Sequence, residues 1–229
     1  MDRAAVAAIA ALEDDVRRAL YEHVRGAGAP VTRESAATAV GISRKLAAFH
    51  LDKLVDLGLL SSGFGTSTPR RVGRAPRVYE PASTDISVHL PDRTPEVLAE
   101  ILVAAVTDER PDERAEDAAL RLARERGAAL GDAERSRVRG GRLGAERGLT
   151  RAADLLARHG YEPYRSGAAV RLRNCPFHPL AATAPAFVCG LNRAYLAGVV
   201  DGLGAGDRLD AVLAPVAGEC CVELRTAGP

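Results

Sequence analysis

The chain has 229 residues, of which 47% are hydrophobic and 27% are charged, and its formal net charge is +1. This length and composition predict a soluble protein with two modest hydrophobic cores, and therefore two domains. The sequence has no apolar run of the roughly 20 residues that span a bilayer, and its N-terminus lacks the basic flank and apolar core of a signal peptide, so we expect a cytoplasmic protein without membrane contact.

Three helices are predicted in the first part of the chain. Val16, Leu20 and Val24 give the first helix an apolar face. Thr32 is suited to cap the N-terminus of the second helix, which we expect to run to Val40. A tight turn then leads into the third helix.

The third helix has the features of a helix that reads DNA. Ser43 is a good N-cap, and Gly58 suits the left-handed conformation that ends a helix. Apolar residues recur at helical spacing on the side that we expect to be packed: Leu46, Phe49, Leu54 and Leu57. Short or cationic side chains near the helix N-terminus would face the major groove. The candidate DNA-contacting residues of this helix are Ser43, Arg44, Lys45, Ala47 and Ala48.

A β-hairpin with a cationic tip is predicted next, from strands over residues 59–64 and 77–80. The arginines between and beside the strands are Arg70, Arg71, Arg74 and Arg77. Because the net charge is only +1, a DNA-binding interpretation depends on this local cluster. The alternative is an ordinary helical core with a solvated arginine-rich loop.

Residues from about 11 to 80 resemble the winged helix-turn-helix of ArsR-type bacterial regulators. The segment from Ala48 to Leu60, Ala-Phe-His-Leu-Asp-Lys-Leu-Val-Asp-Leu-Gly-Leu-Leu, resembles the family segment S-x-H-L-x-x-L-x-x-x-G-L. It departs at Ala48, where the family usually has a hydroxyl side chain. The resemblance implies a winged helix-turn-helix domain over residues 1–82 that binds a double-stranded DNA operator. We interpret His50 as a helix-packing or phosphate-side residue and not as a metal ligand.

Residues 83–110 are expected to link two domains. Polar and apolar residues alternate over residues 85–90, which predicts a strand. Thr94 is suited to cap an amphipathic helix over residues 95–106. A helix in this place often pairs the subunits of a homodimeric regulator. Packing of the helix on its own domain is the alternative.

The remaining residues, 111–229, are expected to form an α+β effector domain, so that the whole chain belongs to the α+β class. The predicted helices cover residues 112–130, 150–159 and 186–202. The predicted strands cover residues 161–164, 168–173, 209–213 and 219–225. The Arg- and Gly-rich segment 131–148 has few apolar side chains that could be buried in a core, and we expect it to be mobile.

All four cysteines lie in the last quarter of the chain, which favours free thiols in a reducing compartment over a disulfide framework. Cys175 and His178 have the spacing of a metal-binding knuckle, and Cys189 lies at a predicted helix start. Successive strand residues point to opposite faces, so Cys220 and Cys221 are not expected to bind one metal together. Cys220 would lie on the apolar face of the predicted strand, with Val222 and Leu224, and is the preferred ligand. The candidate metal ligands are therefore Cys175, His178, Cys189 and Cys220.

Residues from Arg114 onward resemble the effector half of regulators that include the SufR-type iron–sulfur repressors, in which three widely spaced cysteines hold a cluster. The resemblance implies this role for Cys175, Cys189 and Cys220. Residues 150–225 are also distantly similar to the 4-vinyl-reductase domain, which holds a structural zinc. Because His178 would complete a Cys3His shell, Zn²⁺ is the first expectation; an iron–sulfur cluster and free buried or redox-active thiols are the alternatives.

These patterns predict a dimeric transcription regulator, most simply a repressor, with a structural or sensory Cys/His metal centre. The first alternative is an iron–sulfur or redox-sensing regulator of the SufR type. Another is a structural zinc combined with sensing of a small organic effector. A metal-dependent enzyme with a nucleic-acid-binding appendage is disfavoured, because the sequence has no HExxH, Walker A or GxSxG motif. We therefore expect that the protein is not an enzyme.

Overall fold

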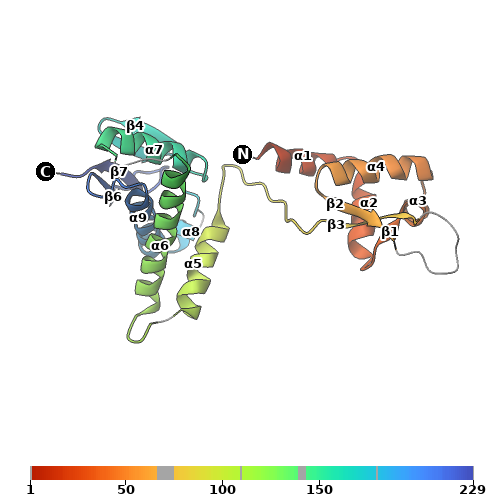
Figure 1. Cartoon of the computed structure of the whole chain (residues 1–229), viewed down its shortest axis with the longest axis horizontal. Helices are drawn as coiled ribbons and strands as arrows, with labels where there is room; N and C mark the ends of the chain where they lie inside the picture. Colours follow the sequence, from red (N-terminus) through yellow and green to blue (C-terminus); the bar gives the residue numbers. More distant parts are fainter. Residues whose placement is uncertain (1, 66–74, 109, 139–142, 179, 229) are drawn as a thin grey trace. The chain divides into compact units, whose positions relative to one another are not determined.

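The computed structural model of the chain describes residues 2–65, 75–108, 110–138, 143–178 and 180–228. It has mixed helices and strands, as expected for the α+β class. The chain divides into two compact units, here called unit 1 (residues 1–89) and unit 2 (residues 90–229) (Figure 1). The helix predicted within the linker 83–110 belongs to unit 2, so the boundary lies inside the segment predicted to join the domains.

The helices of unit 1 begin and end where local signals place them. Those described are α1 (Arg3–Ala11), α2 (Asp15–Gly26), α3 (Arg33–Val40) and α4 (Arg44–Asp56). The hydroxyl of Thr32 accepts a hydrogen bond from the backbone N–H of Ser35, and that of Ser43 accepts one from Leu46. Gly41, which joins α3 to α4, has a φ of 73°, in the left-handed region that glycine adopts without strain. These two of the three predicted N-caps are therefore confirmed.

An antiparallel sheet completes unit 1. Its described strands are β1 (Val31–Thr32), β2 (Leu60–Phe64) and β3 (Arg77–Pro81), in the order β1-β3-β2. Phe64 pairs with Arg77 at one end of the β2–β3 hairpin, and Leu60 pairs with Pro81 at the other. Apolar side chains of α2, α3, α4 and the sheet form one core.

Unit 2 packs helices against a second antiparallel sheet. Its described helices are α5 (Pro95–Thr107), α6 (Ala115–Arg137), α7 (Ala145–Ala157), α8 (Leu180–Thr183) and α9 (Pro185–Gly202). Its described strands are β4 (Pro163–Ser166), β5 (Ala169–Leu172), β6 (Leu209–Leu213) and β7 (Val222–Thr226), in the order β4-β5-β7-β6. None of the described helices is both long and apolar enough to cross a membrane.

Three predictions about the middle of the chain are wrong. Thr94 precedes α5, but its side chain makes no capping hydrogen bond. Residues 85–90 do not form a strand. The segment 131–148, expected to be mobile, is helical at both ends, because α6 runs on to Arg137 and α7 begins at Ala145. Helix α6 continues through this segment because Gly131, although small, is buried against the backbone of α9.

Helices α6 and α9 approach each other through glycines, an arrangement that the periodicity of apolar residues did not reveal. A Cβ atom on Gly127 of α6 would lie 1.9 Å from the carbonyl oxygen of Tyr195, and one on Gly198 of α9 would lie 2.0 Å from that of Arg124. Gly131 and Gly202 have similarly close backbone neighbours. The two backbones are thus in direct contact, which only residues without a side chain allow.

Candidate functional site

The packed face of α4 differs from the predicted one. Its buried residues are Ala47, His50, Leu51 and Leu54. Leu46 and Phe49, which were expected in the core, are 41% and 65% exposed. Ala47 is 0% exposed, so its proposed contact with DNA is wrong. Leu54, also expected in the core, is 0% exposed, and Leu57 packs partly buried against that core. The apolar pattern misled at Leu46 and Phe49, because the buried position at His50 is not apolar.

The other candidate residues of α4 remain near its N-terminus. Arg44 and Lys45 are exposed, and Ala48 is half-buried. Ser43 is exposed too, but its hydroxyl already caps the helix. His50 lies on the packed face at 8% exposure, and among the described residues no hydrogen-bond partner is found for its Nδ1 atom. The helix-packing interpretation of His50 agrees with this position.

Arg77 is the one hairpin arginine of the predicted site that falls within the described residues; Arg70, Arg71 and Arg74 lie outside them. Its guanidinium forms an ion pair with Asp52 of α4, with an N–O distance of 3.2 Å, and donates a hydrogen bond to the Ser62 hydroxyl at 2.9 Å. The structure thus gives Arg77 intramolecular partners.

Asp52 is the centre of a polar cluster that sequence reasoning missed. Its carboxylate accepts hydrogen bonds from the Tyr79 hydroxyl at 2.6 Å and from Arg33 at 3.1 Å, in addition to the ion pair with Arg77. Arg33 also donates to the Tyr79 hydroxyl at 2.7 Å, which raises the pKa of this guanidinium. We call Arg33, Asp52, Arg77 and Tyr79 the Asp52 cluster. It ties α3 and β3 to α4.

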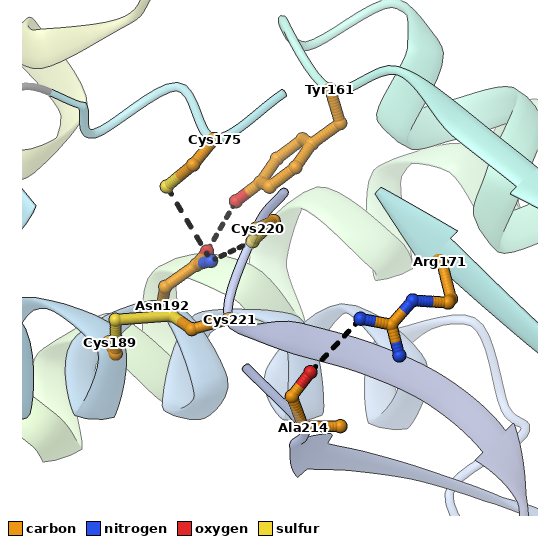
Figure 2. The surroundings of a disulfide bond; sticks show 8 residues. All are labelled: Tyr161, Arg171, Cys175, Cys189, Asn192, Ala214, Cys220 and Cys221. Atoms are coloured by element: carbon orange, nitrogen blue, oxygen red, sulfur yellow. Dashed lines mark hydrogen bonds between the residues drawn. A yellow bond between two sulfur atoms is a disulfide. The ribbon is translucent and has the colours of Figure 1, made fainter. Parts of the chain in front are cut away.

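The four cysteines meet in unit 2, although they come from three segments (Figure 2). Cys175 follows β5, Cys189 lies in α9, and Cys220 and Cys221 immediately precede β7. Cys189 and Cys221 form a disulfide with a Cα–Cα distance of 6.2 Å. The expectation of free thiols is therefore wrong for this pair and correct for Cys175 and Cys220. Cys220 is buried and Cys221 is not, as predicted, although both lie before the strand that was expected to carry them.

The Cys175 and Cys220 thiols share a hydrogen-bonded site that is built around Asn192 of α9. The side-chain amide of Asn192, which is 0% exposed, donates to the sulfur of Cys220 at 3.1 Å and faces that of Cys175 at 4.0 Å. The hydroxyl of Tyr161 donates to the amide oxygen of Asn192 at 2.6 Å, which fixes the orientation of the amide (Figure 2). No sequence motif marked Tyr161 or Asn192 as part of a site.

The two thiols differ in acidity. The Cys220 S–H group donates to Cys175, and the backbone N–H groups of Phe177 and His178 add to this, so that the pKa of Cys175 falls to about 7 despite its burial. The same shared hydrogen bond, together with burial, raises the pKa of Cys220. Cys175 is therefore the sulfur that carries negative charge first as the pH rises.

His178 is exposed, but it shares a cavity with Cys175. The cavity has a volume of about 300 Å³, and its other lining residues are Arg93, Arg173, Asn174, Gly218 and Glu219. The predicted knuckle thus places the thiol of Cys175 and the imidazole of His178 at the same cavity. Cys189 and Cys220 do not line this cavity.

Arg171 holds the segment that carries Cys220 and Cys221. It donates to the carboxylates of Glu219 at 2.8 Å and Glu223 at 2.6 Å. It also donates to the carbonyl oxygen of Ala214 at 3.0 Å (Figure 2). The Arg171 guanidinium holds the pKa of Glu219 below its usual value. This half-buried β5 residue therefore fixes both ends of the dicysteine segment.

The predicted metal shell is not assembled in this disulfide form. Within the described ranges, no group of three or more His, Cys, Asp or Glu side chains could hold a metal ion. Cys175 and Cys220 would supply two thiolate ligands, whereas the sulfur of Cys189 is bonded to Cys221. The residues present therefore fit a zinc ion or a cluster only if that disulfide is reduced.

Comparisons with known proteins identify no relative: no protein-family model, no curated protein and no solved structure matches the chain.

Proposed function

We propose that the protein is a DNA-binding transcription regulator whose unit 1 is a winged helix-turn-helix domain. The observation that carries the proposal is the N-terminal turn of α4, which follows α3 across a left-handed glycine and exposes Arg44 and Lys45 beside a capped helix start. A helix end of this kind suits contacts with base edges in a major groove, and the β2–β3 hairpin suits the wing. The ArsR-like resemblance of the sequence supports the same proposal.

Exposed apolar side chains support a homodimeric regulator. Helix α5 packs Leu98, Ile101 and Ala105 into the core of unit 2, as the alternative of packing on its own domain requires. On its other side it leaves Val103 and Val106 64% and 69% exposed. Covering such residues with a second copy would remove apolar surface from water. We propose a dimer that binds a symmetric operator and most simply acts as a repressor.

The DNA-binding proposal is tested by selecting preferred sequences from a random duplex library and measuring binding to the selected duplex. Replacing Arg44 by alanine should weaken this binding by about 1 to 3 kcal/mol, the value of a good base contact, and relax the preference at one base position. Lys53→Ala removes an exposed cation from the last turn of the same helix and should leave the preference unchanged. Equal affinity and preference in Arg44→Ala would remove Arg44 from the recognition surface.

We further propose that the cysteine site of unit 2 controls DNA binding, by means of its thiols or of a metal centre. Its support is the convergence of a disulfide and two hydrogen-bonded thiols in one place. Reduction of the disulfide by a dithiol would give Cys189 and Cys221 as thiols and leave the dithiol oxidised. Zn²⁺ held by Cys175, Cys189, Cys220 and His178 remains the first candidate, and an iron–sulfur cluster is the alternative; zinc would add structural stability and a cluster would add redox sensing.

The state of the cysteines predicts the outcome of alkylation followed by intact-mass measurement. In protein purified in air and unfolded without reductant, two cysteines should be alkylated and two should remain protected as Cys189–Cys221. After reduction, all four should react. Alkylation of all four in the unreduced sample would contradict the disulfide.

Metal analysis of protein purified anaerobically with a dithiol separates the candidates. Stoichiometric zinc in a colourless sample supports the first, and iron with sulfide in a brown sample supports the alternative. Absence of any metal in this reduced sample would leave a thiol-based site. The control of DNA binding is tested by comparing the affinity of reduced and oxidised protein for the selected duplex, and equal affinities would contradict it.

A further inference from the structure

The Asp52 cluster contains more positive than negative charge. One carboxylate, that of Asp52, is shared by the guanidinium groups of Arg33 and Arg77. Both guanidinium carbons also lie near the ring of Tyr79, at 5.8 Å and 5.5 Å from its centroid. Cation–π contact and hydrogen bonding therefore act together to hold the two arginines in place.

The cluster is open to solvent on one side. The side chains of Arg33, Asp52 and Arg77 are 30%, 39% and 36% exposed, whereas Tyr79 beneath them is fully buried. A phosphate presents oxygens to arginine in much the same geometry as a carboxylate does. Each guanidinium could thus exchange Asp52 for a DNA phosphate while the core of unit 1 remains intact.

We propose that Asp52 limits the number of arginines that unit 1 offers to DNA phosphates, by holding Arg33 and Arg77 in intramolecular pairs. This inference rests on the proposed DNA-binding function. Phosphate contacts raise affinity without regard to sequence, and each contributes to the salt dependence of binding. Asp52 acts through the arginines and is therefore a positioning residue.

The test measures binding of the full-length protein to a mixed-sequence duplex over a series of salt concentrations. Asp52→Asn keeps the shape of the side chain but removes the charge that holds the arginines. The slope of log K against log salt should become steeper by roughly 0.9 for each arginine released, and so by up to about 1.8. Asp56→Asn removes the same charge from an exposed position one turn further along α4, outside the cluster, and should leave the slope unchanged.

Arg77→Gln tests the same idea without disturbing Asp52. In the otherwise unchanged chain it should leave the salt slope as it is, because Asp52 already keeps Arg77 from phosphates. In the Asp52→Asn background it should reduce the slope by roughly 0.9. A reduced slope for Arg77→Gln alone would overturn the inference, and this arm decides the matter if Asp52→Asn fails to fold.

The outcomes separate the inference from the function on which it rests. Absence of duplex binding by the unsubstituted protein at low salt would overturn the proposed function and the inference with it. Binding by that protein together with equal slopes for it and Asp52→Asn would overturn the inference alone. A similar steepening in Asp56→Asn would also overturn it, since the general loss of negative charge would then explain the change.

Discussion

Replacing Gly198 by alanine is expected to lower the free energy of unfolding of unit 2 by about 3 kcal/mol, at the upper end of the usual cost of overpacking. The added Cβ would lie 2.0 Å from the carbonyl oxygen of Arg124 and 2.8 Å from the backbone nitrogen of Ala128. Because both neighbours are backbone atoms of α6, no side-chain rotation can relieve the clash. The two helices must separate, which opens the core between them.

Gly190→Ala is the matched control, because it is the same substitution in the same helix. Its Cβ would meet the end of the Leu120 side chain at 3.7 Å, an ordinary contact distance. Alanine is the better helix former by roughly 0.5 to 1 kcal/mol, so this variant should be slightly more stable than the unsubstituted protein. Denaturant unfolding followed by circular dichroism measures both variants. A Gly198→Ala variant as stable as Gly190→Ala would contradict the close approach of α6 and α9.

Elements marked by local signals could be predicted from the sequence. Thr32 and Ser43 cap their helices as expected, Gly58 has a left-handed φ of 73°, and strand β6 has the predicted bounds. Each of these depends on residues that are neighbours in the chain. The direction in which α4 faces depends instead on what packs against it, so the apolar pattern was right for Leu54 and wrong for Leu46 and Phe49.

Contacts between distant segments were beyond prediction from the sequence. The Asp52 cluster joins residues up to 46 positions apart, and Arg33 stands in no motif. The glycines of α6 and α9 look like helix-weakening residues until the two helices are seen together. The knuckle spacing did place Cys175 and His178 on one cavity. One disulfide among four cysteines can form in six ways, however, and nothing in the sequence selects Cys189–Cys221.

Replacing Asn192 by aspartate is expected to give a variant whose stability depends strongly on pH. When protonated, the introduced carboxyl has nearly the shape of the amide and can still accept the Tyr161 hydrogen bond and donate to the sulfur of Cys220. The variant should therefore be close to the unsubstituted protein in stability near pH 4. When ionised, the carboxylate would be fully buried beside Cys175, whose pKa is lowered to about 7. Among the described residues, no cation is a hydrogen-bond partner of this position.

The sign of the pH dependence follows from burial, which raises the pKa of the introduced carboxyl in the folded state above its unfolded value of about 3.9. Below that unfolded pKa both states are protonated and the variant loses nothing. As the pH rises above it, the unfolded state releases the proton first, and the variant loses about 1.4 kcal/mol of stability per pH unit up to the folded pKa. With a folded pKa near 7, the loss at neutral pH reaches about 4 kcal/mol. Urea unfolding of both proteins between pH 4 and pH 7 measures this loss of stability. A difference in stability that is constant with pH would mean that water reaches Asn192 and that this residue is not enclosed between the two thiols.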